Sequence, residues 1–201
     1  IAKCDVLDRA MAGLNEGKSV RRLDFTTEEI RDFQFLTSKP ILYVANVDEG
    51  KPDPELIGPL QERAQKEGAK VVVLCTKIEA EIVQLPLEER SAYYESAGIT
   101  TPGLAALAQA GQNLLWLVCF FTAGPQETRA WLIPQGTRAV KAAGKIHSDI
   151  ERGFIRAEIY KYEDLVRLGN YKELQTKNLI TLEGKDYLMQ DGDVAYFRFS
   201  V

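Results

Sequence analysis

The sequence is poor in the residues that build disulfide frameworks, metal centres and membrane spans. It has three cysteines and one histidine among 201 residues. Cys4, Cys75 and Cys119 are odd in number and far apart, which argues against a disulfide framework and offers no metal-ligand spacing. The longest apolar run, 114–121, is far shorter than the roughly twenty residues that span a bilayer. We therefore expect a reduced, soluble, cytoplasmic protein with no metal site and no membrane partner.

Basic residues are not in excess either. The chain has 25 Lys and Arg against 29 Asp and Glu, a net charge of −4, and is 45% hydrophobic. This balance is typical of a globular chain, and it excludes wholesale disorder and a histone-like coat for nucleic acid, so no DNA partner is expected.

The charge is unevenly distributed, because residues 125–162 carry seven basic and four acidic side chains. A solvated face would explain this stretch. The alternative is an RNA or ribosome contact. Its candidate residues are Arg138, Lys141, Lys145 and Arg152.

The start of the chain predicts a helix. Ile1 is not preceded by a capping residue, and the first residues do not resemble a signal peptide, so we expect the true N-terminus to lie upstream. Gly13 and Gly17 should end this helix. Apolar residues recur at helical spacing at Val6, Leu7, Ala10, Met11 and Leu14.

The first half of the chain predicts an α/β fold. Residues 41–45 and 70–75 are nearly all apolar, as in strands covered on both faces, and 55–66 between them is helical, with Leu56, Leu60 and Ala64 inward. Strand, helix and strand at these lengths form a βαβ unit with a parallel sheet. Thr26 should cap a short helix ending at Phe35. Further helices are expected over 78–85, 86–95 and 103–109.

The second half, from about residue 115, predicts a small α+β domain. Residues 114–122 and 129–133 should form a hairpin around a turn at Gly124-Pro125, followed by a short helix over 137–143. Strands are expected over 154–160, whose alternation indicates a half-exposed strand, and over 194–199 after a turn at 190–193. A further apolar segment covers 186–189. Four or five strands and one main helix result.

One glycine-rich segment has to be rejected as a phosphate site. Gly13-Leu-Asn-Glu-Gly17-Lys18-Ser19 has three residues between its glycines, where a P-loop needs four, and it follows a helix rather than a strand. We expect a helix end followed by a turn.

Two polar loops follow the predicted buried strands. Asn46, Val47 and Glu49 come after the first strand, and Cys75, Thr76 and Lys77 come at the end of the second. Parallel strands in α/β sheets place such loops at one ligand-binding edge. GTPases read guanine there with Asn and Asp; Glu49 is longer, and the usual Lys is missing. A purine-base site and a purely structural loop both remain open at this stage.

Nothing in the sequence supplies a catalytic constellation. His147 lies beside Asp149 and Glu151, but no nucleophile or third partner accompanies it. We expect His147 to make a local hydrogen bond at a helix-to-strand connection. Cys119, in an apolar strand, is expected in the core.

Several segments together closely resemble the YchF family, the Obg-like ATPases. They are Tyr43-Val-Ala-Asn-Val-Asp-Glu, Ile78-Glu-Ala-Glu-Ile, Phe120-Phe-Thr-Ala-Gly, Arg129-Ala-Trp, residues 142–158, Glu183-Gly-Lys-Asp-Tyr, Gln190-Asp-Gly-Asp-Val and Phe197-Arg-Phe-Ser-Val. The last of these departs from the usual Asn-Val ending of the family. The resemblance implies that residues 1–22 end a helical coiled-coil arm, 23–113 are the C-terminal part of a P-loop GTPase-like nucleotide domain, and 114–201 form a TGS domain of β-grasp fold.

The resemblance also implies a function. The family's Asn-x-x-Glu loop falls on Asn46 and Glu49 and implies binding of ATP in preference to GTP, with Cys75, Thr76 and Lys77 flanking the base. The P-loop, the switches and the Mg²⁺ ligands have no counterpart here, so this chain alone should neither hold nucleotide well nor hydrolyse it. Family members associate with ribosomes and regulate translation or stress responses. The alternative is a non-catalytic RNA- or ribosome-binding module.

Overall fold

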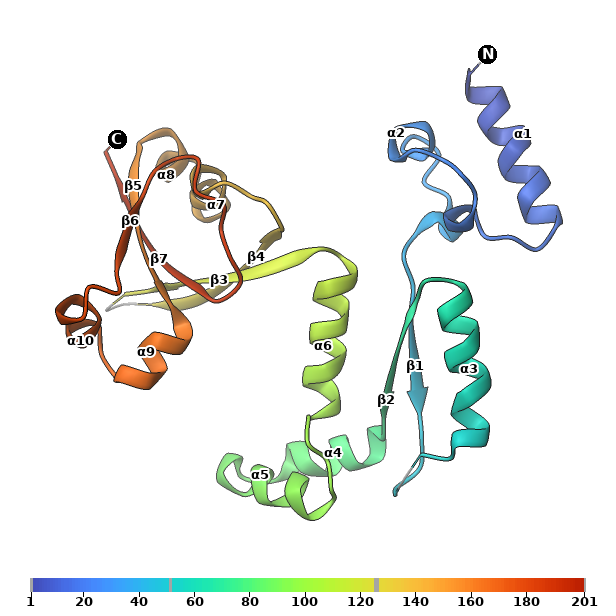
Figure 1. Ribbon diagram of the computed structural model, residues 1–201, viewed down its shortest axis with the longest axis horizontal. Coiled ribbons are helices and arrows are strands. Elements are labelled where there is room, and N and C mark those ends of the chain that lie inside the picture. Colours follow the sequence, from blue (N-terminus) through green and yellow to red (C-terminus); the bar gives the residue numbers. More distant parts are fainter. Residues whose placement is uncertain (1, 51, 125–126, 201) are drawn as a thin grey trace. The chain divides into compact units, whose positions relative to one another are not determined.

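The chain divides into two compact units, Ile1–Leu114 and Leu115–Val201. The structure, a computed structural model, describes residues 2–50, 52–124 and 127–200 (Figure 1). We call the two parts unit 1 and unit 2 and describe each by itself.

Unit 1 is built around a parallel strand pair. Strands β1 (Leu42–Asn46) and β2 (Lys70–Leu74) pair so that Asn46 lies opposite Leu74. This confirms the predicted βαβ unit. The helices of unit 1 are α1 (Ala2–Asn15), α2 (Thr27–Ile30), α3 (Pro54–Lys66), α4 (Thr76–Gln84), α5 (Leu87–Ser96) and α6 (Gly103–Leu114), with 3-10 turns at Val20–Arg22 and Leu36–Ser38.

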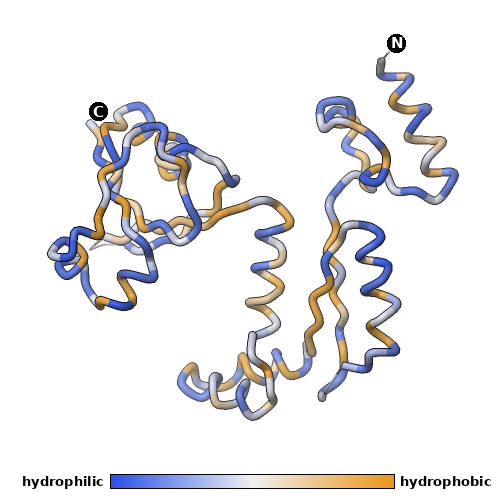
Figure 2. The backbone as a smooth tube through the Cα atoms, viewed as in Figure 1, coloured by the Kyte–Doolittle hydropathy of each residue, from blue (hydrophilic) through white to orange (hydrophobic). Residues whose placement is uncertain are grey.

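The core of unit 1 lies between β2 and α6. Val72 and Leu74 of β2 pack against Ala110 of α6, and the hydrophobic residues of both strands are visible in Figure 2. α1 ends at Asn15 and the following Gly17 has φ 75°, so the Gly13–Ser19 segment is the helix end and turn that the spacing predicts.

Several details of unit 1 differ from the prediction. The helix that Thr26 caps stops at Ile30 instead of Phe35, because Gln34 takes a left-handed φ of 49°. Leu56 is 77% exposed, since α3 turns Ile57 inward in its place, whereas Ala64 is buried as predicted. Val44 of β1 is 44% exposed, so the described part of the chain does not cover both faces of this strand pair.

Unit 2 is a five-stranded mixed sheet with helices on both faces. The strand order is β4-β3-β7-β5-β6, in which β3 and β7 are parallel and the other neighbours antiparallel. The strands are β3 (Leu117–Ala123), β4 (Thr128–Pro134), β5 (Phe154–Lys161), β6 (Thr181–Glu183) and β7 (Asp193–Phe199); the helices are α7 (Ala139–Ile146), α8 (Ser148–Arg152), α9 (Tyr162–Leu168) and α10 (Tyr171–Thr176).

The two faces of this sheet carry different cores. Under α7, the alanines Ala139, Ala142 and Ala143 are fully buried, and their small side chains let the helix lie close to Phe120 and Phe197. On the opposite face, α9 and α10 pack with a second cluster. Its buried members are Tyr160, Leu174 and Val194.

The prediction for unit 2 holds for the hairpin and for the existence of the strands β5 and β7, and it fails at the ends of elements. α6 continues to Leu114, past the predicted end at Gln109, and Trp116 takes a φ of 54° before β3 begins at Leu117. Residues 186–189 form a single bridge, Leu188 to Arg138, rather than a strand. The turn at Gly124-Pro125 falls partly outside the described residues, and α9 and α10 were not predicted.

Candidate functional site

The two polar loops singled out in the sequence meet at the carboxyl edge of the β1–β2 pair. The register brings the ends of both strands level, and the Val47 N–H donates to the Leu74 carbonyl at 3.0 Å. A cavity of about 280 Å³ opens there. It is lined by all six predicted residues, Asn46, Val47, Glu49, Cys75, Thr76 and Lys77, together with Asp48. We call this cavity the edge site.

Asn46 links the two loops directly. Its Oδ1 accepts from the Thr76 N–H at 3.1 Å and from the Thr76 hydroxyl at 3.0 Å. Thr76 is the first residue of α4, and the cap residue Cys75 makes no side-chain capping bond. Asn46 therefore satisfies a helix N-terminal N–H that would otherwise be unpaired, and it fixes the position of one loop against the other.

Glu49 and Lys77 close the outer side of the edge site. Their Oε1 and Nζ atoms lie 2.6 Å apart, and both side chains are more than half exposed. The Glu49 carboxylate raises the pKa of Lys77 by hydrogen bonding and charge. An exposed pair of this kind contributes little to stability, because water and salt screen it. Its consequence for the site is a carboxylate acceptor held over the loop.

A buried carboxylate supports the loops from behind. Glu79 of α4 is 5% exposed; its Oε1 accepts from the Gly103 N–H at 2.6 Å and its Oε2 from the Tyr94 hydroxyl at 2.9 Å. This joins α4 to α5 and α6 and so holds Thr76 in place. Sequence reasoning missed Glu79, although its position one turn before the fully buried Ile82 was a usable signal.

The described residues offer no group of three or more His, Cys, Asp or Glu side chains that could hold a metal ion. None of the described helices combines the length and the apolar character needed to cross a membrane. The three cysteines are free. Cys119 is half-buried rather than fully in the core, and burial raises the pKa of its thiol.

His147 makes the local hydrogen bond that its position suggested. Its Nδ1 accepts from the Asp149 N–H at 3.2 Å, which caps the five-residue helix α8. The pKa of Asp149 is lowered chiefly by its hydrogen bond from Arg152, with a smaller effect of His147. The histidine thus contributes to a connection between two helices, α7 and α8, and not to the predicted helix-to-strand connection.

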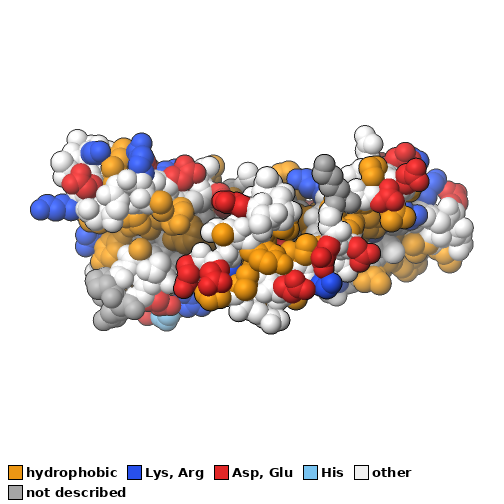
Figure 3. Space-filling model, turned by 90° about the horizontal axis from the view of Figure 1, so that it is seen from below, with side chains coloured by type: hydrophobic (Ala, Val, Ile, Leu, Met, Phe, Trp, Pro, Cys, Tyr) orange, Lys and Arg blue, Asp and Glu red, His pale blue; other side chains and the backbone are white. Residues whose placement is uncertain are grey.

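Three of the four basic candidates in unit 2 are paired with acids. Arg138 lies 3.1 Å from Asp186, Lys141 lies 2.5 Å from Glu151, and Arg152 pairs with Asp149. Lys145 has no ion pair among the described residues. The face drawn in Figure 3 shows the same interspersion of acidic and basic side chains. The local excess of positive charge is therefore largely compensated.

The chain is similar in sequence to known proteins over nearly its whole length. The model of the YchF-GTPase_C family, described as a protein of unknown function (DUF933), matches residues 117–200. The Ribosome-binding ATPase YchF of Bacillus subtilis is 45% identical over 98% of this chain, and that of Escherichia coli O157:H7 is 42% identical over 100% of it. The chain spans 56% of the length of each of these two relatives.

Solved structures also relate the chain to YchF proteins. The Schizosaccharomyces pombe YchF GTPase matches with a TM-score of 0.77 and 26% identity, covering 96% of this chain and 53% of that one. A GTP-binding protein from Pyrococcus horikoshii matches with a TM-score of 0.56 at 16% identity, which supports the fold alone. The chain belongs to the YchF family and is homologous to the C-terminal region of its ribosome-binding ATPases.

Proposed function

We propose that this chain is the part of a ribosome-associated ATPase that holds the nucleotide base and contacts the ribosome. The observation that carries the proposal is the hydrogen bonding of Asn46 to Thr76, which joins the two polar loops into one edge site. Ligands of α/β sheets bind at this edge, outside the carboxyl ends of the strands. Both relatives are named ribosome-binding ATPases.

The edge site favours adenine over guanine on chemical grounds. Guanine presents two adjacent donors, N1–H and the 2-amino group, which a short Asp carboxylate in a GTPase accepts together. Glu49 is one methylene longer, and Lys77 already occupies one side of its carboxylate at 2.6 Å. Adenine lacks that donor pair, so the longer carboxylate and its pairing with Lys77 do not weaken the binding of adenine. Cys75 and Thr76 then flank the base from the second loop.

Hydrolysis depends on parts that this chain does not contain. Phosphate binding needs a glycine-rich loop after a strand, and Mg²⁺ needs oxygen ligands beside the phosphates. In the full-length protein, ATP with Mg²⁺ would bridge those parts and the edge site. Ordering of the switches by nucleotide would then reposition the arm of residues 1–22 and unit 2, and so regulate translation or stress responses in the cytoplasm.

Unit 2 supplies the ribosome contact in this proposal. Its strand order, with the parallel pair β3–β7 in the centre and α7 across one face, supports the assignment of residues 114–201 as a β-grasp TGS domain. A purely RNA- or ribosome-binding module is the second candidate. The excess of basic residues over 125–162 favours it, and the acid pairing of Arg138, Lys141 and Arg152 weakens it.

The test is a comparison of ATP and GTP binding by the full-length protein. Calorimetry with Mg²⁺ should give at least tenfold tighter binding of ATP, and Glu49→Asp should narrow that difference by restoring the shorter carboxylate. Glu55→Asp, an exposed change at the first turn of α3, is the matched control and should leave the ratio unchanged. Tighter binding of GTP by the unmodified protein would overturn the proposal.

A further inference from the structure

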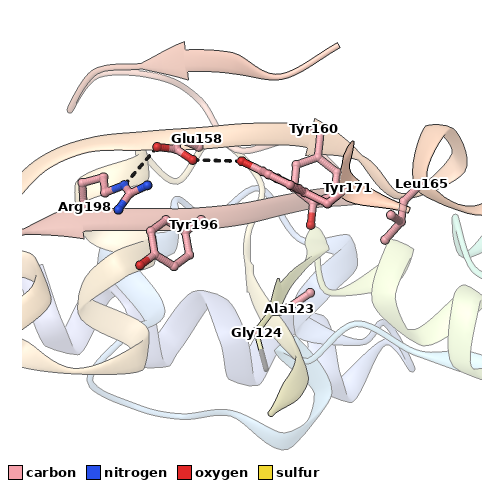
Figure 4. A pocket seen from close by; sticks show the side chains of 8 residues that line it. All are labelled: Ala123, Gly124, Glu158, Tyr160, Leu165, Tyr171, Tyr196 and Arg198. Carbon is pink, nitrogen blue, oxygen red and sulfur yellow. Dashed lines mark hydrogen bonds and ion pairs between the residues drawn. The ribbon is translucent and has the colours of Figure 1, made fainter. Parts of the chain in front are cut away.

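An open pocket of about 540 Å³ lies on the sheet face of unit 2 opposite α7, and the proposed function leaves it unexplained (Figure 4). Alternation along β5 and β7 places Glu158, Tyr196 and Arg198 on this face, because Ala157 and Phe197 between them belong to the core under α7. Its lining also includes Tyr160, Leu165 and Tyr171. The volume suits a small planar ligand.

A carboxylate that is largely withdrawn from water lies in the pocket wall. The Glu158 side chain is 12% exposed, its Oε1 accepts from Arg198 Nε at 2.9 Å, and its Oε2 accepts from the Tyr171 hydroxyl at 3.2 Å. A carboxylate has about four acceptor positions, so each oxygen can accept one further hydrogen bond. The site thus holds fixed acceptors for a ligand N–H donor.

Beside this carboxylate lies an aromatic surface. Tyr196 is 47% exposed, and the guanidinium carbon of Arg198 lies 4.5 Å from its ring centroid. Tyr160 and Tyr171 meet edge-on with centroids 5.7 Å apart. The guanidinium lies over one face of the Tyr196 ring and leaves the ring half-exposed, and tyrosine rings and arginine planes are both surfaces on which unpaired bases stack.

The rim of the pocket is positive. Arg156 lies opposite Arg198 in the β5–β7 register and is exposed, with no ion pair among the described residues. Arg198 forms an ion pair with Glu158, so the two arginines and this one carboxylate together carry a net positive charge. Positive side chains at the edge of a stacking surface fit a phosphodiester backbone rather than an acidic or apolar peptide.

We propose that this pocket binds an unpaired base of single-stranded RNA that carries an exocyclic amino group, namely adenine, cytosine or guanine. The base stacks on the part of the Tyr196 ring that Arg198 leaves exposed, its amino group donates to Glu158, and Arg156 lies near the phosphates. Uracil has no amino group and leaves the carboxylate without its donor. The choice of RNA over another polyanion rests on the proposed function, since the relatives are named as ribosome-binding proteins.

The experiment measures binding of fluorescently labelled hexa-adenylate and hexa-uridylate to this chain by fluorescence anisotropy. The affinity for hexa-adenylate should be at least about ten times the affinity for hexa-uridylate. Tyr196→Ala should weaken adenylate binding about tenfold or more, the scale expected for one base-stacking interaction, while Tyr196→Phe retains binding. Tyr93→Ala, a similarly exposed tyrosine of unit 1, is the matched control. Circular dichroism verifies that each variant is folded.

Equal binding of the two oligonucleotides, or unchanged binding by Tyr196→Ala, would overturn the proposal. Competition by adenosine monophosphate as strong as by the oligonucleotide would also overturn it, because the site would then be one for a free nucleotide. These results are independent of the ATP and GTP comparison: a GTP preference of the full-length protein would refute the proposed function and leave the adenylate result unaffected.

Discussion

A single oxygen atom of Asn46 accepts two hydrogen bonds from Thr76, at 3.1 Å from its backbone nitrogen and 3.0 Å from its hydroxyl. The end of β1 and the beginning of α4 are 30 residues apart in the chain, and this side chain links them beside the Val47–Leu74 backbone hydrogen bond and the Glu49–Lys77 ion pair. Asn46 therefore contributes directly to the geometry of the edge site.

Replacing Asn46 with alanine should separate the two loops. We expect the free energy of unfolding to fall by about 1 kcal/mol, since the Thr76 N–H and hydroxyl lose a shared acceptor at an exposed site. In the full-length protein, ATP affinity should fall about tenfold, which corresponds to about 1.4 kcal/mol. Urea unfolding and calorimetry measure the two effects. Asn113→Ala, on the exposed side of α6, should change neither by more than about 0.5 kcal/mol.

Two glycines of α6 should respond in opposite ways to alanine. A Cβ at Gly103 would lie 2.8 Å from the Leu74 Cβ and 2.9 Å from Glu79 Oε1, whereas one at Gly111 meets no atom within 4 Å. Gly103→Ala should destabilise unit 1 by about 1–3 kcal/mol through overpacking. Gly111→Ala should stabilise it by up to about 1 kcal/mol through helix propensity.

Spectroscopy can assign that change to unit 1. Both tryptophans, Trp116 and Trp131, lie in unit 2, so circular dichroism follows the whole chain while tryptophan fluorescence follows unit 2. In urea unfolding, Gly103→Ala should shift the part of the dichroism curve that reports the unfolding of unit 1. The fluorescence curve, which reports unit 2, should not move. An equal shift of both curves would show that the strain is not confined to unit 1.

The sequence predicts the edge site better than it predicts the ends of helices. Two apolar runs with a helix between them define a parallel pair, and strand polarity then brings Asn46 and Thr76 to one edge whatever the details of packing. The predicted end of the helix that Thr26 caps was wrong, because Gln34 adopts a left-handed conformation, for which glutamine has no marked preference. Local propensity cannot reveal such a residue.

Contacts between residues far apart in the chain could not be predicted from the sequence, for a related reason. Glu79 finds its partners at Tyr94 and Gly103, and Glu158 finds Arg198 across the sheet. The excess of basic residues over 125–162 was visible in the sequence, but the acids that neutralise Arg138 and Lys141 come from Asp186 and Glu151, one of which lies outside that stretch. Ion pairing is set by tertiary structure and not by local composition.

The stability of unit 2 should decrease in alkaline solution through Tyr187. Its hydroxyl donates to Asp193 Oδ2 at 3.0 Å, and Asp193 is fully buried, with Lys161 Nζ at 2.5 Å from its other oxygen. Burial, and then the negative charge of Asp193, raise the pKa of Tyr187 far above its usual value near 10. The phenol therefore stays protonated in the folded state while it ionises in the unfolded state.

The sign follows from proton counting. Above about pH 10 the unfolded chain loses the Tyr187 proton first, so it binds fewer protons than the folded chain and stability falls as the pH rises. Below that pH the contribution is fully present. Tyr187→Phe should lower stability by about 1 kcal/mol at pH 8 and flatten the loss between pH 10 and 11. Tyr162→Phe, at an exposed tyrosine, is the control, and urea midpoints across this range provide the measurement.

A flat profile of the unmodified protein above pH 10 would contradict this account. The profile of Tyr187→Phe should not become completely flat, because burial raises the pKa of Tyr160 and Tyr171 as well. The neutral form of each of these tyrosines is favoured in the folded state for the same reason. The change produced by Tyr187→Phe is therefore the quantity to compare with the change produced by Tyr162→Phe.

Charge reversal on α7 and at its N-cap residue tests whether the basic stretch contacts a polyanion. Reversal of Arg138, Lys141 and Lys145 to glutamate in the full-length protein should weaken ribosome association and make it less sensitive to salt. The slope of log affinity against log salt concentration should fall by roughly 0.7–0.9 for each phosphate that the protein no longer neutralises. Sedimentation with ribosomes at several salt concentrations measures both effects, and an unchanged slope would remove this stretch from the interface.

Lys145 should account for most of that effect. Arg138 and Lys141 already share their charge with Asp186 and Glu151, so part of their attraction for phosphate is cancelled before any partner binds, whereas Lys145 has no ion pair within the described residues. Lys145→Glu alone should therefore weaken ribosome association more than Arg138→Glu does. Lys39→Glu, an exposed lysine of unit 1, changes the net charge equally and controls for long-range repulsion. Equal losses for Lys145→Glu and Lys39→Glu would show that net charge, and not a contact on α7, governs the association.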